Sequence, residues 1–416
     1  MKIVHWTIYY FMLVNFHVIH SNFIDSIRFL DSNEVNENSD CLLSPVILIP
    51  GFGGSKMEAK LNKPTAPHWW CSKKSDYFNI WLDYHPVLSF DCWMDNLKLV
   101  YDPETRKTKN TPGVVTRVIG WGSTESMEWI WIFGAYFNYI SEALVNRGYI
   151  RGKNLFGAPY DFRKGPNEST QWFQNLKQLT EYSYGINKNT RVTFIAYSMG
   201  GRMLLHFLQQ MPQDWKDKYL ERTITLAVPW GGSVRPIQAV SVGYDLGIAV
   251  FPNDKLKEMS NTFPSLAYLM PSKQFWEPDE ALVIMDSKSY SLENIDEFFY
   301  DIGQPQMAEI RKDQSVYNNF TAPGVEIHCL FGANIPTAER LYFKSGFNSK
   351  PVILDGDGDG QVNRRSLWGC RHWENTPAQA GHAVYFKEFK DVNHLKILYN
   401  SESINYILKI VTCDAN

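Results

Sequence analysis

The chain has 416 residues, of which 44% are hydrophobic and 15% aromatic, so it can bury one large core or the cores of two domains. Its 41 basic and 44 acidic residues give a formal net charge of -3, and no basic stripe indicates a nucleic-acid partner. Composition and charge therefore favour a large globular protein and argue against one that binds nucleic acid.

The N-terminal segment predicts a route through the secretory pathway. An apolar run at residues 3–19 follows Lys2, is interrupted by Asn15 and His17, and gives way to a polar stretch that ends at Asp40. Because the run falls short of a comfortable bilayer span, we expect residues 1–20 to be a cleaved signal peptide rather than an anchor. The predicted destination is the lysosome or the extracellular fluid.

This route favours disulfides, which persist in oxidising compartments. The six cysteines form two pairs that each bracket a segment, and two residues without an obvious local partner: Cys71 and Cys92, Cys329 and Cys370, then Cys41 and Cys413. No C-x-x-C pair occurs, so no metal site is predicted. Two sequons make Asn167 and Asn319 candidates for glycosylation.

Apolar, strand-like runs alternate with helical patterns along the rest of the chain. We expect strands at 45–49, 192–196, 223–227 and 383–389, and helices at 137–147, 173–184, 203–208 and 395–399. Such alternation indicates a mostly parallel sheet with helices on both faces. Two stretches break the rhythm, the aromatic residues 61–100 and the long loops expected at 230–318. Both are interpreted as insertions that shape a substrate site.

One short segment has the form of a nucleophile elbow. Ser198 lies between a predicted strand and a predicted helix, with Ala196 two residues before it and Gly200 two residues after it. A strained strand-to-helix turn needs small residues at these two positions. The alternative is an ordinary serine that caps a helix. The choice depends on whether the chain supplies a base and an acid.

Candidate partners follow Ser198 in the order that this elbow requires. His394 comes after a predicted strand and before a predicted helix, where the base belongs, although a histidine there could equally be a surface residue. The acid is expected in the segment Leu354–Gly360, which alternates three aspartates with glycines. This segment also resembles the start of a calcium loop, but Ser366 stands where that loop needs a glutamate. The residues alone leave the choice among Asp355, Asp357 and Asp359 open.

An oxyanion intermediate needs two preorganised backbone N–H donors. Met199, directly after the serine, can supply one, and the glycine-rich loop Pro50–Gly54 after the first strand can supply the other. That loop could also be a simple tight turn. Taken together in chain order, these signals predict a serine hydrolase that needs no cofactor.

From about residue 45 to residue 408 the chain resembles the lecithin:cholesterol acyltransferase family. The segments that carry the resemblance are Lys60–Pro64, Cys71–Lys74, Asp91–Asp95, Ala158–Arg163, Trp215–Lys218, Pro229–Gly232, His328–Gly332 and Gly356–Gly360. The resemblance implies an α/β-hydrolase core with a small disulfide-pinned membrane-binding subdomain and a cap insertion. The implied ranges are 41–60, 101–228 and 319–413 for the core, 61–100 for the subdomain and 229–318 for the cap.

The resemblance also implies roles for single residues. Ser198 would be the nucleophile, His394 the base and Asp359 the acid, with Phe52 and Met199 as the oxyanion donors. The implied disulfides join Cys71 to Cys92 and Cys329 to Cys370.

Two positions depart from the family pattern. Tyr197 stands where family members have a histidine, and Phe52 stands where they have aspartate or cysteine. Backbone donors survive a change of side chain, so catalysis should persist. Phe52, however, removes a carboxylate that could contribute to the pH dependence.

We therefore expect a secretory-route serine phospholipase A and acyltransferase that acts at a phospholipid membrane surface. It would release a fatty acid, or transfer the acyl chain to a lipid alcohol such as ceramide or a sterol. The alternatives are a secreted sterol acyltransferase of the same family and a catalytically silent lipid-binding protein.

Several aromatic residues are assigned to lipid contact. Trp69, Trp70 and Trp81 are expected to contact the membrane, unless they cover a small core of their own. Trp230 is expected near an acyl tunnel, unless it belongs to a structural turn. Asp161 and Arg163 are expected to form a buried ion pair beneath the site.

Overall fold

The computed structural model describes residues 43–81, 90–130, 134–244, 252–347 and 349–412. The predicted signal peptide, Cys41 and Cys413 lie outside the described residues. Among the residues described, no helix combines the length and the apolar character needed to cross a bilayer.

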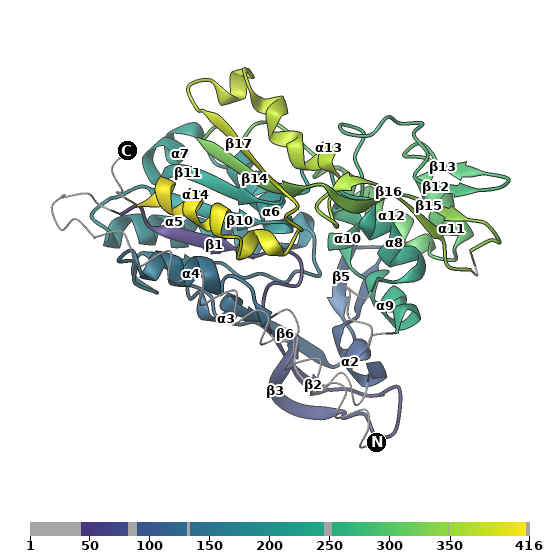
Figure 1. Cartoon of the computed structure of the whole chain (residues 1–416). Helices are drawn as coiled ribbons and strands as arrows, with labels where there is room; N and C mark the ends of the chain where they lie inside the picture. The colour runs from purple at the N-terminus through teal and green to yellow at the C-terminus, as the bar shows by residue number, and fades with distance from the viewer. Residues whose placement is uncertain (1–42, 82–89, 131–133, 245–251, 348, 413–416) are drawn as a thin grey trace, which may run out of the picture. The chain divides into compact units, whose positions relative to one another are not determined.

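A parallel six-stranded sheet forms the core, in the order β17-β14-β11-β10-β1-β9 (Figure 1). Its strands are β1 (Val46–Ile49), β9 (Leu155–Gly157), β10 (Val192–Tyr197), β11 (Leu220–Leu226), β14 (Ile327–Ala333) and β17 (Val384–Lys390). Every residue of β1 and β10 is buried, because helices cover both faces of a parallel sheet. This burial is why these two strands were recognisable as continuous apolar runs.

The direction of winding reverses between β1 and β10. The chain goes from β1 to β9 at one edge and then returns past β1 to β10, from where it continues to β11. Right-handed crossovers place the intervening helices on opposite faces after such a reversal. The helix before the reversal is α4 (Asn138–Val145), and those after it are α5 (Thr170–Ile186), α6 (Met199–Gln210) and α7 (Gln213–Tyr219). The C-terminal helix α14 (Ser401–Val411) packs against α4. Ligands bind open α/β sheets at such a reversal, beyond the carboxyl ends of the strands.

A small antiparallel sheet, β3-β2-β6, follows β1 in the chain. Its elements and neighbours are β2 (Met57–Asn62), β3 (Lys74–Trp81), β6 (Val114–Val118), the helix α2 (Phe90–Leu97) and the hairpin β4 (Leu99–Asp102) to β5 (Lys107–Asn110). The disulfide Cys71–Cys92 ties the loop before β3 to α2. This subdomain thus extends to β6, beyond the range 61–100 assigned from the sequence.

Arg163 joins this subdomain to the core. Its fully buried guanidinium pairs with Asp161 at 2.7 Å and donates to the carbonyl of Leu97 at 3.0 Å and to Oγ1 of Thr116 at 2.9 Å. The expected ion pair is therefore present, and it also satisfies groups from α2 and β6. A buried guanidinium is tolerated when charge and hydrogen-bond partners surround it in this way.

The segment between β11 and β14 contains five described helices, where long loops were expected. They are α8 (Arg235–Val242), α9 (Asn253–Ser260), α10 (Pro264–Tyr268), α11 (Ile295–Asp301) and α12 (Pro305–Ser315). The expectation of long loops is wrong because these helices are short. Even α12 has only 11 residues, which leaves little room for a 3.6-residue period to show.

A second sheet, β13-β12-β15-β16, combines strands from two of the predicted ranges. The strands β12 (Val283–Met285) and β13 (Ser289–Tyr290) come from the predicted cap, whereas β15 (Ile335–Phe343) and β16 (Val352–Gly358) come from the range assigned to the core. The boundary expected at residue 319 therefore does not separate the two sheets. The remaining elements are α3 (Glu125–Glu128), β7 (Trp129–Ile130), β8 (Gly134–Ala135), α13 (Arg364–Leu367) and 3-10 helices at Pro166–Glu168, Trp368–Trp373, Pro377–Gln379 and Lys396–Leu398.

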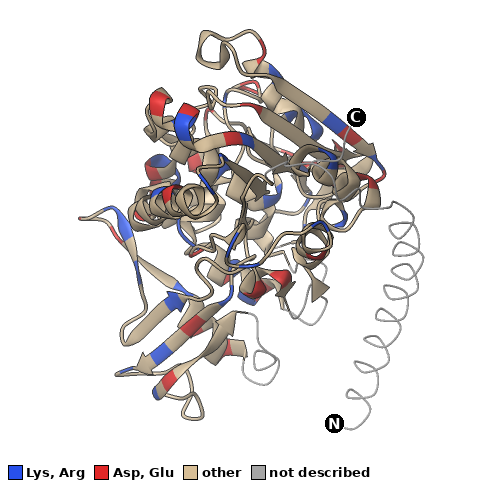
Figure 2. Cartoon of the chain, turned by 90° about the vertical axis from the view of Figure 1, so that its left-hand side faces the viewer, with Lys and Arg blue, Asp and Glu red and all other residues tan. Residues whose placement is uncertain are grey.

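Basic and acidic residues are interspersed along the described chain (Figure 2). Two pairs link α2 and its end to α9: Lys98 lies 3.1 Å from Glu258, and Lys255 lies 3.3 Å from Asp91. The second disulfide, Cys329–Cys370, joins β14 to the 3-10 helix Trp368–Trp373.

Candidate active site

Ser198 lies between the last residue of β10 and the first residue of α6, at the reversal of the sheet. Its φ of 51° and ψ of -126° are strained values for a residue with a side chain, and they raise its hydroxyl above the carboxyl edge of the sheet. The turn packs tightly on the loop after β1. A Cβ atom added at Gly200 would lie 2.3 Å from the carbonyl oxygen of Pro50. This contact explains why only glycine fits two residues after the serine.

The side chains of Ser198, His394 and Asp359 form one hydrogen-bonded chain. Oγ of Ser198 lies 2.9 Å from Nε2 of His394, and Nδ1 of the same imidazole lies 2.7 Å from Oδ2 of Asp359. The backbone N–H of His394 also donates to the carbonyl oxygen of Asp359 at 2.8 Å. The structure therefore brings the three predicted residues together, with the imidazole between the hydroxyl and the carboxylate.

Asp359 is distinguished from its two neighbours by its position. It is 1% exposed, and its Oδ1 accepts the N–H groups of Gln361 and Val362 at 3.0 and 2.8 Å. Asp355 and Asp357 are exposed on β16, and Asp357 accepts instead from the backbone of the loop before β15. The described residues contain no group of three or more side chains suited to hold a metal ion. Asp355 and Asp357 thus lie on a strand and Asp359 directly follows it, which is not the geometry of a calcium-binding loop.

The loop Pro50–Gly54 lies directly beside the serine. A Cβ atom added at Gly51 would lie 2.8 Å from Cβ of Ser198. Within the loop, the N–H of Gly51 donates to Oη of Tyr136 and the N–H of Gly54 donates to the carbonyl of Gly51, whereas no described residue accepts the N–H of Phe52. Met199 is the first residue of α6, where backbone N–H groups lack intrahelical acceptors. Two free donors thus border the nucleophile.

Two aromatic side chains support this loop. The half-buried ring of Phe52 packs 5.2 Å from that of Phe162 and 6.4 Å from that of Phe263, between centroids. The indole of Trp81 donates to the carbonyl of Gly53 at 2.7 Å and is only 4% exposed. The prediction that Trp81 contacts a membrane is therefore wrong. Its side chain belongs to the core of the subdomain, which was the alternative considered.

Trp230 is also buried, at 4% exposure, so it does not face a membrane surface, and its expected place near an acyl tunnel stays a prediction. Its ring packs 4.8 Å from that of Trp373 and 6.1 Å from that of Phe320, in a cluster that includes the Cys329–Cys370 disulfide. Gly232, two residues later, has a φ of +91°, where a side chain would be strained. This is the structural turn that the sequence left as the alternative.

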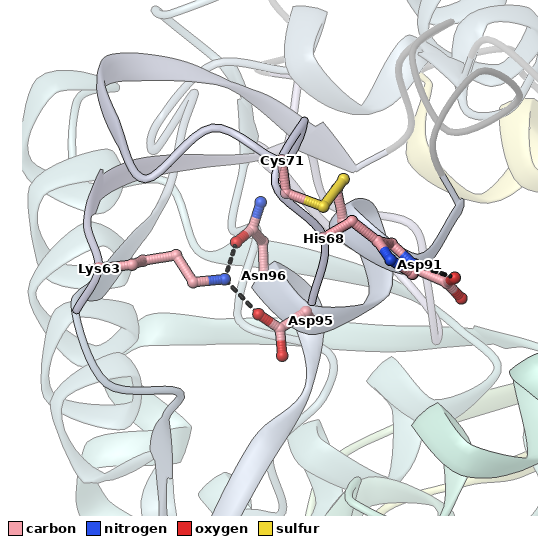
Figure 3. The surroundings of a disulfide bond; sticks show 7 residues. Lys63, His68, Cys71, Asp91, Asp95 and Asn96 are labelled. Atoms are coloured by element: carbon pink, nitrogen blue, oxygen red, sulfur yellow. Dashed lines mark hydrogen bonds and ion pairs between the residues drawn. A yellow bond between two sulfur atoms is a disulfide. The ribbon is translucent and has the colours of Figure 1, made fainter. Parts of the chain in front are cut away.

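Trp69 and Trp70 differ from the other two tryptophans, with 91% and 56% exposure. The ring of Trp70 stacks on that of His68 at 4.2 Å, and Nε2 of His68 lies 2.7 Å from Asp91 (Figure 3). The hydrogen bond with His68 lowers the pKa of Asp91, with a further contribution from Lys255. The Cys71–Cys92 disulfide fixes the same loop, so two large aromatic side chains are held outside the subdomain.

The other end of this loop is fixed by Lys63. Its ammonium group donates to Oδ1 of Asn96 at 2.7 Å and to the carboxylate of Asp95, both on α2 (Figure 3). The side chain of Lys63 is nearly inaccessible, so these partners satisfy a charge that water does not reach.

The two sequons differ in accessibility. Asn319 and Thr321 are exposed, with their side chains hydrogen-bonded to each other at 2.7 Å. Asn167 is half-buried, and its Oδ1 accepts from Nε2 of Gln314 at 2.8 Å. Asn319 is therefore the more accessible acceptor for a glycan.

Two tyrosines near the site were given no role from the sequence, where Tyr197 was noted only as a departure from the family pattern. Tyr197 donates its hydroxyl to the backbone carbonyl of His394 at 3.0 Å, and Tyr136 accepts from Gly51. Tyr136 lies directly before a predicted helix, where nothing in the local pattern indicates a role. A partner 85 residues away in the chain could be found only from the folded structure.

A parallel sheet with a strained serine at its reversal defines an esterase-type enzyme of the α/β-hydrolase class when that serine is hydrogen-bonded to a histidine, which in turn is hydrogen-bonded to a buried carboxylate. The chain belongs to the lecithin:cholesterol acyltransferase family, whose model matches residues 77–321 and 306–401. The resemblance drawn from the sequence motifs is confirmed.

Named relatives of two kinds are similar to this chain. It is 36% identical over 375 residues to the lysosomal phospholipase A and acyltransferase of Homo sapiens, covering 88% of this chain and 90% of that protein. It is 37% identical over 367 residues to the phosphatidylcholine-sterol acyltransferase of Gallus gallus, covering 86% and 87%. A chain in the crystal structure of the Tle4-Tli4 complex superposes with a TM-score of 0.53 at 13% identity, covering 90% of this chain and 99% of that one, and this likeness concerns the fold alone.

These relatives confirm two predictions made from the sequence. The chain is an enzyme of the class that hydrolyses esters and transfers acyl groups. The predicted localisation, lysosome or secreted, also agrees with them, since the human relative is named as lysosomal.

Proposed function

We propose that this chain is a secretory-route serine phospholipase A and acyltransferase in which Ser198 is the nucleophile, His394 the base and Asp359 the acid. The observation that carries the proposal is the hydrogen-bonded chain from Oγ of Ser198 through the imidazole to the buried carboxylate. Its geometry is that required for a serine to lose its proton as it attacks a carbonyl carbon.

In the first half-reaction, Oγ of Ser198 attacks the ester carbonyl of a phospholipid while Nε2 of His394 takes the hydroxyl proton. The N–H groups of Phe52 and Met199 donate to the oxyanion that forms. When the tetrahedral intermediate collapses, the bond from the acyl carbon to the glycerol oxygen breaks. His394 returns the proton to that oxygen, so a lysophospholipid leaves and the acyl group stays on Ser198. Asp359 remains ionised and holds the imidazole in the required tautomer.

In the second half-reaction, an acceptor hydroxyl attacks the acyl carbon and gives its proton to His394. The bond from the acyl carbon to Oγ of Ser198 then breaks, and His394 returns the proton to Oγ, so the free enzyme is restored. Water yields a free fatty acid, whereas the hydroxyl of a lipid alcohol, ceramide or a sterol, yields a new ester. The ratio of the two products reflects how well the acceptor displaces water from the acyl-enzyme.

The substrate would be taken from a phospholipid membrane surface. The exposed indoles of Trp69 and Trp70 support this, because tryptophan favours the depth of the headgroups, with an apolar ring and one N–H donor. Their loop is held by the Cys71–Cys92 disulfide, so insertion would need little further ordering of the chain.

The test measures fatty acid release and acyl transfer from phospholipid vesicles that contain ceramide or cholesterol, at acid and neutral pH. Ser198→Ala should abolish both products. Asp359→Asn should lower kcat by about 10⁴-fold, because the histidine loses its oriented tautomer. Asp355→Asn is the matched control, since Asp355 is exposed on the same segment, and it should stay within about twofold of the wild type. Equal losses in the two aspartate variants would exclude Asp359 as the acid.

A sterol acyltransferase is the second candidate, because the Gallus gallus relative is as similar to this chain as the human one. Preferred transfer to cholesterol, with little hydrolysis, would favour it, whereas transfer to ceramide at acid pH would favour the first proposal. A wild type that binds vesicles but releases no fatty acid would instead identify a silent lipid-binding protein.

A further inference from the structure

Tyr136 is anchored in the core before its side chain reaches the site. Its backbone N–H donates to the carbonyl of Glu128 at 2.7 Å, and the N–H of Phe137 donates to the carbonyl of Met127 at 3.1 Å. Both residues are buried, and their rings pack at 5.1 Å between centroids. The phenol of Tyr136 is therefore a rigid feature of the fold.

The hydroxyl of Tyr136 is enclosed by the glycine loop. Gly51 donates its N–H to Oη of Tyr136 at 2.9 Å, and a Cβ atom added at Gly54 would lie 2.5 Å from the same oxygen. The loop thus wraps around one hydroxyl group, with a hydrogen bond from its first glycine and a close approach by its last one. The close approach gives Gly54 a reason that a tight turn alone does not supply, because a side chain there would clash with the phenol.

The hydrogen bond also decides which amide of the loop faces the nucleophile. Because the N–H of Gly51 is used by Tyr136, the next donor along the loop is the N–H of Phe52, which no described residue accepts. We propose that Tyr136 is a positioning residue whose hydroxyl fixes the Gly51–Phe52 segment, so that the Phe52 N–H is held ready for the oxyanion at Ser198. This inference rests on the proposed function, because it assigns a role in the same reaction.

Tyr197 extends the same support to the histidine. Its ring lies 5.5 Å from that of Tyr136, and a Cβ atom added at Gly51 would come within 3.0 Å of its Cδ1. Its hydroxyl donates to the carbonyl of His394 at 3.0 Å. The two tyrosines therefore contact both loops that flank Ser198. Burial raises the pKa of both phenols, so both remain neutral hydroxyls across the working pH range.

The experiment compares Tyr136→Phe with Tyr160→Phe, using the full chain and fatty acid release from phosphatidylcholine vesicles. Tyr160 is a matched control, because it is equally buried and its hydroxyl has no hydrogen-bond partner among the described residues. Tyr136→Phe should lower kcat about tenfold, less than the 10²-fold or more expected when an oxyanion donor is removed outright. KM should stay within about twofold, since substrate binding does not use the oxyanion donor. Tyr160→Phe should leave both parameters unchanged.

A second readout separates positioning from general loosening of the fold. A fluorophosphonate places a phosphoryl oxygen where the oxyanion forms, so its rate of reaction with Ser198 should fall in Tyr136→Phe by about the same factor as kcat. The midpoint of the pH profile of kcat/KM should not move, because His394 and Asp359 keep their contacts.

A kcat within twofold of the wild type would overturn the inference, and so would equal losses in the two tyrosine variants. A loss in Tyr136→Phe that moves the pH midpoint would also overturn it, because the effect would then lie at the histidine. Failure of the proposed function would appear differently, as a wild type without Ser198-dependent release.

Discussion

The tight contact at the serine turn gives a sharp prediction for Gly200→Ala. The added Cβ atom would lie 2.3 Å from the carbonyl oxygen of Pro50 and 2.9 Å from that of Ile49. An ordinary carbon–oxygen contact needs about 3.3 Å, so α6 must move away from β1 by about 1 Å. Because both obstacles are backbone atoms, no side chain can rotate to relieve the clash.

The magnitude follows from two opposing terms. Overpacking of this kind costs about 3 kcal/mol at the upper end of the usual range, whereas alanine in place of glycine favours a helix by about 1 kcal/mol. Gly200→Ala should therefore lower the free energy of unfolding by about 2 kcal/mol. Gly185→Ala is the matched control, since Gly185 lies in α5 with no atom within 4 Å of an added Cβ, and it should raise that free energy by about 1 kcal/mol.

Urea unfolding measures this difference of about 3 kcal/mol between the two variants, and vesicle assays measure its effect on the reaction. A shift of about 1 Å between Ser198 and the oxyanion loop should lower kcat about 10²-fold in Gly200→Ala alone. If Gly200→Ala proves as stable and as active as Gly185→Ala, the close packing of the serine turn on the β1 loop is not what positions the nucleophile.

Three further predictions concern the surface loop, the buried ion pair and the second disulfide. Trp70→Ala should reduce vesicle binding while leaving the melting temperature nearly unchanged, and a large fall in melting temperature would show that the indole supports the subdomain. Burial acts to raise the pKa of Asp161, but the charge and hydrogen bonds of Arg163 outweigh it and hold that pKa below its ordinary value. The pair therefore stabilises the fold above about pH 4 and loses this effect as the pH falls through the lowered pKa, so Asp161→Asn should lower the melting temperature at pH 5 and 7, and by progressively less as the pH falls below about 4. Replacing Cys329 and Cys370 together by alanine removes a disulfide that spans a sequence separation of 41 residues. The free energy of unfolding, measured with urea, should fall by about 3–4 kcal/mol, and a fall below about 1 kcal/mol would contradict this.

The sequence predicted best what short local patterns determine. The strands β1 and β10 are buried on both faces, so their continuous apolar runs marked the two sides of the site. Ser198 follows β10, and His394 follows β17, whose alternating pattern also marks a strand, so the ends of both strands could be located from local patterns. The apolar stretch after His394, expected to be a helix at 395–399, is instead a 3-10 turn at Lys396–Leu398, followed by α14.

Features that depend on distant partners were not predictable in this way. Nothing in their local sequence separates the four tryptophans that were assigned to lipid contact. Trp81 is paired with Met57 across β2 and β3, and this pairing turns its indole inward. Trp69 lies in the loop before β3 and stays exposed. The three aspartates of one alternating segment are equally alike, and only the loop beyond β16 buries Asp359. Here the family resemblance supplied a choice that the residues alone left open.

The second sheet sets a limit on how this protein can be redesigned. Asp359 follows β16, which pairs with β15, and β15 in turn has β12 as its parallel neighbour. Residues 229–318 are therefore not an exchangeable module that can be cut out or replaced by the corresponding segment of another hydrolase. A graft that omits β12 would leave one edge of β15 unpaired. This strand forms a hairpin with β16, which directly precedes Asp359. Chimeras meant to change lipid preference should keep β12 together with β15 and β16. They should exchange only α11 and α12, the helices that lie between β12 and β15 in the chain.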